Sequence, residues 1–268
     1  MTFSISRLSG AFGAEVRGVD LAHEIGDNLF QTLRQTWLDH DGIMVVRDQH
    51  RLTPTQHVDL ASRFGTLIDP DTPDHRLPGH PLVYRVSYPV AETPKPRDFV
   101  DTGNAWHADY ADAGTWSGVS ILHVIEMPPK GGDIFFADLY AAYDALSPAM
   151  QQMQAPLAAV HSSAAHVKHR DGKPGSVHPI VRTHPETGRK ILFVSPGFTT
   201  AVVGLTAKES HALLGFLNDH VTQPAFILRH RWIAGDLVFW DNRCNLHNAM
   251  GDYAGGGRVT FHRVSVSG

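Results

Sequence analysis

The spacing of apolar residues along the chain changes between helix-like and strand-like segments. Between residues 27 and 40, Phe30, Leu33 and Trp37 recur on one helical face, and Gly42 ends the predicted helix. Residues 43–46 are apolar and β-branched, which predicts a buried strand. Similar runs predict further strands at residues 119–125, 191–194, 225–232, 237–240 and 259–266.

Two further helices are predicted from their first turns. Thr53 and Gln56 have the spacing of a capping box, with proline at the first helical position, and the helix should run to about residue 64. Thr206 and Glu209 have the same spacing and predict a second helix start. Both helices should therefore begin at well-defined positions.

The order of these elements predicts a mainly β fold with flanking helices. Many short strands with few helices outside them are typical of an antiparallel jelly roll of two sheets. No shift in composition requires a second domain, so we expect one domain over residues 1–268. Residues 69–104 and 161–178 lack clear periodicity, and we expect them to form lid-like loops over a functional site.

Composition narrows the class of protein. Hydrophobic residues make up 42% and charged residues 19%, as in ordinary soluble proteins, and the net charge of -4 argues against nucleic-acid or membrane partners. The single cysteine, Cys244, excludes an intramolecular disulfide and fits a reducing compartment. The first residues contain no long apolar run, so we expect neither signal peptide nor membrane span, and a cytoplasmic location.

Candidate chemistry begins with His107 and Asp109, which are two residues apart. On an extended strand such side chains point to the same face and can converge on one ion. A third ligand would complete a 2-His-1-carboxylate triad, which leaves the remaining positions of the metal open. A lone His-x-Asp also occurs by chance, as a histidine at a strand end beside a solvated aspartate, so a distal histidine has to be found.

Several sequence blocks occur together in one order. They are Gly-Ala-Glu at 13–15 and Gly-Val-Asp at 18–20, Gly-Gly-Asp at 131–133, AAYDALS at 141–147, HPIVRTHP at 178–185 with Gly-Arg-Lys at 188–190, and GDLVFWDNRCNLHNA at 235–249. In this combination the chain resembles the taurine/2,4-dichlorophenoxyacetate dioxygenase (TauD/TfdA) family over nearly its whole length. The resemblance implies a distorted jelly roll, or double-stranded β-helix.

The resemblance also implies a reaction. His247 would be the third ligand, so that His107, Asp109 and His247 would bind Fe²⁺ and form the catalytic centre. The cosubstrate would be 2-oxoglutarate, and O₂ would oxidise, most simply hydroxylate, a small organic substrate. Related enzymes often form homo-oligomers, and we expect one here.

The far carboxylate of 2-oxoglutarate requires a cation, for which arginine is well suited. Arg258, eleven residues after His247, stands where the family places this arginine. Two features depart from the family pattern. Ile134 replaces the usual threonine after Gly-Gly-Asp, and Arg258 and Arg263 are five residues apart, so on a regular strand they face opposite ways.

Two assignments of these arginines are therefore open. If positions are counted forward from His247, Arg258 binds the cosubstrate and His262 binds the substrate. If they are counted back from Arg263, Arg263 binds the substrate and Val259 lies at the cosubstrate position. We favour Arg258 for the cosubstrate, because a carboxylate beside Val259 and Ile134 would lose a charge-assisted hydrogen bond of about 1.5–3 kcal/mol. The second count suits an Fe²⁺ oxygenase that does not use 2-oxoglutarate and lets its substrate chelate iron.

The substrate pocket is less defined by sequence. Tyr88 and Asn104 are candidates to line it, and Phe198 matches a pocket aromatic of the family. His262 or Arg263 near the pocket would favour an anionic substrate such as a carboxylate, sulfonate or sulfate ester. A non-catalytic binding protein and a zinc hydrolase are rival interpretations, disfavoured by the intact ligand set and by the lack of a suitably spaced general base.

Overall fold

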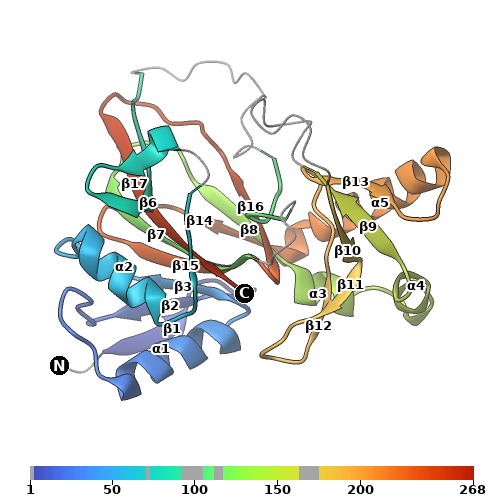
Figure 1. Cartoon of the computed structure of the whole chain (residues 1–268), viewed down its shortest axis with the longest axis horizontal. Helices are drawn as coiled ribbons and strands as arrows, with labels where there is room; N and C mark the ends of the chain where they lie inside the picture. Colours follow the sequence, from blue (N-terminus) through green and yellow to red (C-terminus); the bar gives the residue numbers. More distant parts are fainter. Residues whose placement is uncertain (1–2, 71–72, 92–104, 112–116, 163–174) are drawn as a thin grey trace.

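The computed structural model describes residues 3–70, 73–91, 105–111, 117–162 and 175–268. Its largest part is a sandwich of two β-sheets (Figure 1). The larger sheet has the strand order β1-β2-β3-β15-β7-β17-β6-β5, with β4 paired to β17. Its strands are β1 (Ser4–Arg7), β2 (Ala14–Arg17), β3 (Ile43–Val46), β4 (Leu67–Ile68), β5 (Arg76–Leu77), β6 (His80–Pro89), β7 (Ser117–Glu126), β15 (Leu237–Asp241) and β17 (Arg258–Ser267).

The smaller sheet of the sandwich has three strands in the order β14-β8-β16. They are β14 (Ile227–His230), β8 (Ile134–Asp138) and β16 (Asn245–Ala249). Pairing is antiparallel throughout both sheets except between β2 and β3. The predicted jelly roll, or double-stranded β-helix, is confirmed.

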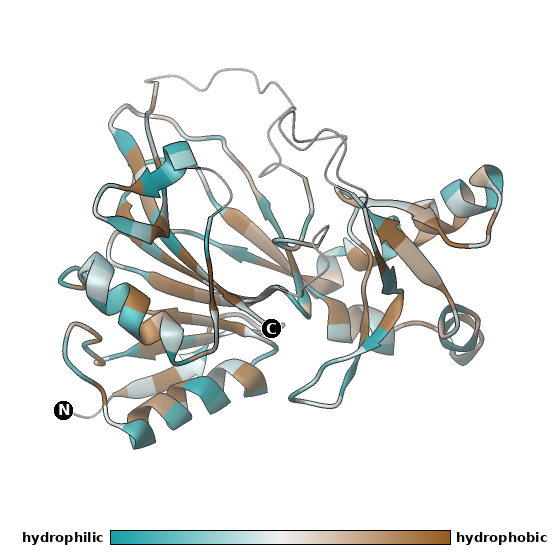
Figure 2. Ribbon diagram, in the orientation of Figure 1, coloured by the Kyte–Doolittle hydropathy of each residue, from teal (hydrophilic) through white to brown (hydrophobic). Residues whose placement is uncertain are grey.

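The two faces of the larger sheet are both buried, which explains its continuous apolar strands. Ile43 and Val45 of β3 pack against the smaller sheet, whereas the alternate residues Met44 and Val46 pack under helices α1 (Asp27–Asp39) and α2 (Pro54–Ser62). In Figure 2 these two helices alternate hydrophobic and hydrophilic residues, while the central strands are mainly hydrophobic. The sheet therefore separates two apolar layers.

Both predicted capping boxes are present. Thr53 and Gln56 cap α2, and Thr206 and Glu209 cap α5 (Ala207–Val221) in the same reciprocal way. The remaining elements are not strands of these two sheets. They are α3 (Leu139–Asp144), α4 (Pro148–Gln154), β9 (Ala158–His161), β10 (Ser176–Pro179), β11 (Val181–Thr183), β12 (Lys190–Leu192), β13 (Thr199–Val202) and the 3₁₀ helices η1 (Pro73–His75) and η3 (Pro224–Phe226).

The prediction that residues 69–104 lack regular structure is wrong for part of that segment. It contains β6, which pairs with β17 without a register shift from Tyr84 to Pro89. Only Val83 of β6 is fully buried, so the strand has no strong apolar alternation to reveal it. Residues 92–104 lie outside the described part, as do residues 163–174 of the second expected loop, whose end forms β10.

No helix among the described residues has the length and apolar character needed to cross a membrane.

Candidate metal centre

His107 and His247 lie side by side because their backbones pair. The amide of His107 donates to the carbonyl of His247 at 3.0 Å, and the reverse bond is 2.8 Å. This antiparallel bridge extends the smaller sheet beyond β16. The two imidazole rings consequently stack at a tilt, with their centroids 4.1 Å apart.

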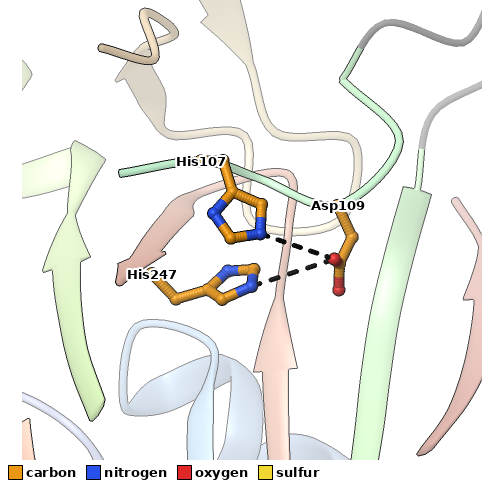
Figure 3. Close-up of side chains that lie close together, drawn as sticks. All are labelled: His107, Asp109 and His247. Carbon is orange, nitrogen blue, oxygen red and sulfur yellow. Dashed lines mark ion pairs between the residues drawn. The ribbon is translucent and has the colours of Figure 1, made fainter. Parts of the chain in front are cut away.

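Asp109 completes the cluster from the turn that follows this bridge. Its Oδ1 lies 3.9 Å from Nε2 of His107 and 3.8 Å from Nε2 of His247 (Figure 3). The expectation that the His-x-Asp triplet lies on a regular strand is wrong. His107 occupies an isolated bridge, Asp109 is in a turn, and Tyr110 has a φ of 58°.

The three donors fit a divalent metal ion. Imidazole nitrogen and carboxylate oxygen bind a first-row divalent ion at about 2.0–2.2 Å, so donors 3.8–3.9 Å apart can reach an ion between them. All three side chains are buried. Nδ1 of His107 lies 2.7 Å from the carbonyl of Ala105, so this ring donates through Nδ1 and leaves the lone pair of Nε2 facing Asp109.

The protonation states also suit metal binding. Burial, reinforced by the neighbouring His107, lowers the pKa of His247 to about 3, so its imidazole is neutral at physiological pH. Burial alone would raise the pKa of Asp109, but Arg263 and the two imidazoles outweigh it and hold that pKa below its usual range. The site therefore presents the neutral imidazole of His247 and the carboxylate of Asp109 to a metal ion.

A loop at residues 195–198 fixes the position of the segment that carries His107. The Ser195 hydroxyl and the Gly197 amide both donate to the carbonyl of Trp106, at 3.0 and 2.9 Å. A side chain at Gly197 would meet this carbonyl and Ala105 at 3.0 Å. The next residue, Phe198, is buried with its ring centroid 5.5 Å from that of His107, so the structure brings this predicted pocket residue to the metal ligands.

Arg263 is the arginine that the structure brings to the triad. Its Nη1 donates to Oδ1 of Asp109 at 2.8 Å. Strand β17 runs regularly against β6 from Arg258 to Arg263, so Val259, Phe261 and Arg263 share the face that looks into the sandwich. The register shift near Phe261 affects only the pairing of β17 with β7. The side chains of β17 continue to alternate between the two faces of the sheet from Arg258 to Arg263.

Other predicted site residues lie elsewhere. Arg258 is exposed at the start of β17, where it donates to the Ser87 hydroxyl at 3.3 Å. His262 is half-buried on the opposite face of the sheet from Arg263, beside His123 of β7. Tyr88 is exposed and packs on Tyr253. Asn104, the remaining candidate, falls outside the described residues.

The positions that the resemblance links to the far carboxylate of 2-oxoglutarate are apolar. Ile134 and Val259 are both buried and belong to the same apolar cluster between the sheets, which also holds Trp240. Val259 therefore occupies the inward position, as the count back from Arg263 predicts. Arg258, the residue that we favoured for the cosubstrate, lies on the outward face. Its role in binding the cosubstrate stays a prediction.

Sequence reasoning missed two polar residues that contact Asp109. The Ser120 hydroxyl donates to Oδ2 of Asp109 at 2.7 Å, and Oδ1 of Asn242 accepts from the Asp109 amide at 3.0 Å. Asn242 belongs to the WDNR string and could have been singled out there. Ser120 carries no sequence signal, because its role depends on how β7 pairs with β15.

A second buried group, His184, Asp241 and Cys244, also has donor atoms close together. Nδ1 of His184 accepts from the amides of residues 186 and 187, and its Nε2 lies 3.0 Å from Asp241. The Asp241 carboxylate also accepts two bonds from Arg243, at 2.8 and 2.7 Å. These bonds occupy the ring nitrogens and the carboxylate within the protein, so we interpret the group as structural.

A double-stranded β-helix that holds two histidines and one carboxylate on its inner face defines a candidate mononuclear iron oxygenase. Residues 4–265 match the model of the family described as taurine catabolism dioxygenase TauD, TfdA family. The chain belongs to this family and is accordingly an oxidoreductase. The predicted family, fold and class of enzyme are confirmed.

Individual relatives agree. The chain is 36% identical to the (S)-phenoxypropionate/alpha-ketoglutarate-dioxygenase of Sphingobium herbicidovorans, over 92% of this chain and 89% of that one. A taurine dioxygenase structure from Burkholderia xenovorans matches with a TM-score of 0.83 and 33% identity, over 99% and 91%. The structure of AAD-2 with Mn(II) and N-oxalylglycine matches with a TM-score of 0.81 and 27% identity, over 100% and 98%.

Proposed function

We propose that this protein is an Fe²⁺- and 2-oxoglutarate-dependent dioxygenase that oxidises, most simply hydroxylates, a small anionic organic substrate. His107, Asp109 and His247 would hold the metal. Bound there, Fe²⁺ would bring O₂ together with the two reductants; oxidative decarboxylation of 2-oxoglutarate to succinate and CO₂ would supply two of the four electrons that reduce O₂, and the substrate would supply the other two. The role of the protein is to hold the reactants in place and to exclude water, which the apolar walls around the buried triad support.

The observation that carries the anionic substrate is the position of Arg263. Its guanidinium reaches Asp109 through Nη1, while Nε is buried and has no hydrogen-bond partner among the described residues. A planar guanidinium with donors left over suits a carboxylate, sulfonate or sulfate. The compounds after which two relatives are named, phenoxypropionate and taurine, each carry an anionic group, a carboxylate and a sulfonate, which agrees with this proposal.

The cosubstrate proposal rests on the open metal face and on the relatives. Three protein ligands leave three octahedral positions, enough for a chelating 2-oxo acid and O₂. N-oxalylglycine, found with Mn(II) in AAD-2, has the same two carboxylates as 2-oxoglutarate. The apolar Ile134 and Val259 favour the second candidate, an oxygenase of this fold whose substrate itself chelates iron.

Anaerobic titration of the Fe²⁺ protein with 2-oxoglutarate separates these candidates. We expect a metal-to-ligand charge-transfer band to appear, and to weaken in Arg258→Gln if the favoured count is correct. In air, consumption of an aryloxyalkanoate, alkanesulfonate or alkyl sulfate should be coupled to succinate formation. Oxygen uptake without succinate, in protein that retains its iron, would select the second candidate.

Further proposals concern the setting of the enzyme. We expect it to act in the cytoplasm as a homo-oligomer on a free small molecule, without nucleic-acid or membrane partners. Size-exclusion chromatography with light scattering would test the oligomeric state.

A further inference from the structure

Asn242 makes polar contacts to four residues at the candidate metal centre. Its Oδ1 accepts from the Asp109 amide at 3.0 Å and from Nε1 of Trp240 at 3.1 Å. Its Nδ2 donates to the carbonyl of Gly118 at 3.2 Å and lies 3.0 Å from the Ser120 hydroxyl oxygen. The side chain is buried on the strand connection directly after β15.

These contacts fix the direction of each hydrogen bond. Because Oδ1 of Asn242 faces two N–H donors, the amide cannot be reversed without setting donor against donor. Nδ2 must therefore face Ser120, whose oxygen accepts from it. The Ser120 hydroxyl hydrogen is then left for Oδ2 of Asp109, 2.7 Å away. The chain of bonds runs in one direction, from Asn242 through Ser120 to the carboxylate.

The end of this chain of bonds holds one of the two carboxylate oxygens. Ser120 donates to Oδ2 and Arg263 donates to Oδ1, and between these two bonds Oδ1 faces His107 and His247. The Asn242–Asp109 backbone bond fixes the turn that carries the carboxylate, which is not held by a regular strand. Strand pairing places the parts, because Trp240 of β15 lies opposite Ser120 of β7.

We propose that Ser120 and Asn242 are positioning residues that keep Oδ1 of Asp109 facing His107 and His247, where it would bind the metal. This inference rests on the proposed metal centre. Without the Ser120 hydroxyl, the carboxylate could rotate, and its Oδ2 would lose a charge-assisted hydrogen bond. Residues that orient a metal ligand typically contribute 10- to 100-fold to metal affinity or activity.

The test is a titration of metal-free protein with Co²⁺, followed by the visible absorption of the bound ion. We expect Ser120→Ala to bind Co²⁺ about 10- to 100-fold more weakly and with an altered absorption spectrum. Ser265→Ala is the matched control, because Ser265 is also buried and lies directly opposite Ser120 on β17. It should bind Co²⁺ like the wild type, with the same spectrum.

A second variant covers the backbone part of the proposal. Asn242→Ala should weaken Co²⁺ binding at least as much as Ser120→Ala, provided that its circular dichroism matches the wild type; if it does not fold, Ser120→Ala decides alone. Equal Co²⁺ affinities and spectra for Ser120→Ala and the wild type would overturn the inference. Failure of the wild type itself to bind Co²⁺ would instead overturn the metal centre and the proposed function.

Discussion

Nη1 of Arg263 lies 2.8 Å from Oδ1 of Asp109, the same oxygen that faces both histidines. The Arg263 guanidinium therefore touches the carboxylate that is proposed to bind the metal, and it lies on the inner face of the last strand. An anion bound by Arg263 would therefore lie beside the metal. The residue proposed to bind the substrate is therefore in direct contact with a proposed metal ligand. The two arginines of β17 differ in this respect, because Arg258 is exposed.

Arg263→Gln should impair recognition of the anionic substrate. Loss of a charge-assisted hydrogen bond costs about 1.5–3 kcal/mol, which corresponds to an increase in KM of roughly 10- to 100-fold. Steady-state kinetics with the best anionic substrate would measure it. Arg17→Gln, which removes an exposed guanidinium on β2, is the control and should leave that KM within about threefold. Equal effects of the two substitutions would contradict the assignment of Arg263.

Ile134→Thr should improve 2-oxoglutarate binding if the cosubstrate lies against this buried residue. One added hydrogen bond is worth about 0.5–1.5 kcal/mol, or roughly 2- to 12-fold in affinity. The anaerobic charge-transfer titration would report it. Ile134→Val is the matched control, since valine has the shape of threonine without the hydroxyl. An affinity of Ile134→Thr no higher than that of Ile134→Val would show that the cosubstrate lies elsewhere.

Two histidines should make the fold less stable in mild acid. Burial lowers the pKa of His57 to about 3 and of His123 to about 4, from 6.5. Between pH 6.5 and about 4 the unfolded chain binds these protons and the folded chain does not. The free energy of unfolding therefore falls as pH falls, by about 1 kcal/mol per pH unit for each group. Urea denaturation between pH 7 and pH 5 measures the slope.

The control for this pH dependence is His57→Leu, which removes one of the two titrating groups. Its slope should be shallower than that of the wild type by up to about 1 kcal/mol per pH unit. A slope unchanged by this substitution would mean that His57 titrates alike in the folded and unfolded chains.

Asp241→Asn should destabilise the fold strongly without removing a metal ligand. The Asp241 carboxylate is fully buried and accepts two bonds from Arg243, so the substitution leaves this buried guanidinium with Glu186 as its remaining ion-pair partner among the described residues. Loss of one partner of such a pair costs about 3–5 kcal/mol. Arg17→Gln, which breaks an exposed ion pair with Glu15, should change the free energy of unfolding far less than Asp241→Asn in the same urea experiment.

Several helices and strands could be predicted because short sequence patterns specify them without contributions from distant parts of the chain. The Thr53 and Thr206 capping boxes and the apolar run at residues 43–46 specify their elements through nearby residues alone. Strand β6 could not be predicted in this way, because all but one of its residues are partly exposed and its place in the sheet depends on pairing with β17.

The residues of the candidate site likewise fall into those that a local motif predicts and those whose position depends on strand register. His107, Asp109 and His247 follow from motifs, and the structure brings them together. Ser120 could not be predicted, because its contact with Asp109 depends on the register of β7 against β15. The choice between Arg258 and Arg263 depends on the register of β17, which the residue count from His247 does not determine.

The glycines at residues 255–257, all with positive φ, immediately precede β17. A residue gained or lost within this flexible lead-in could be absorbed without changing which side chains of the strand point inward. A one-residue insertion or deletion between Arg258 and Arg263 would reverse which side chains point inward at one end of the strand relative to the other. The Arg258 guanidinium would then take the inward position of Val259. Natural variation in length on the two sides of Arg258 should therefore have opposite consequences, harmless before it and able to redesign ligand preference after it.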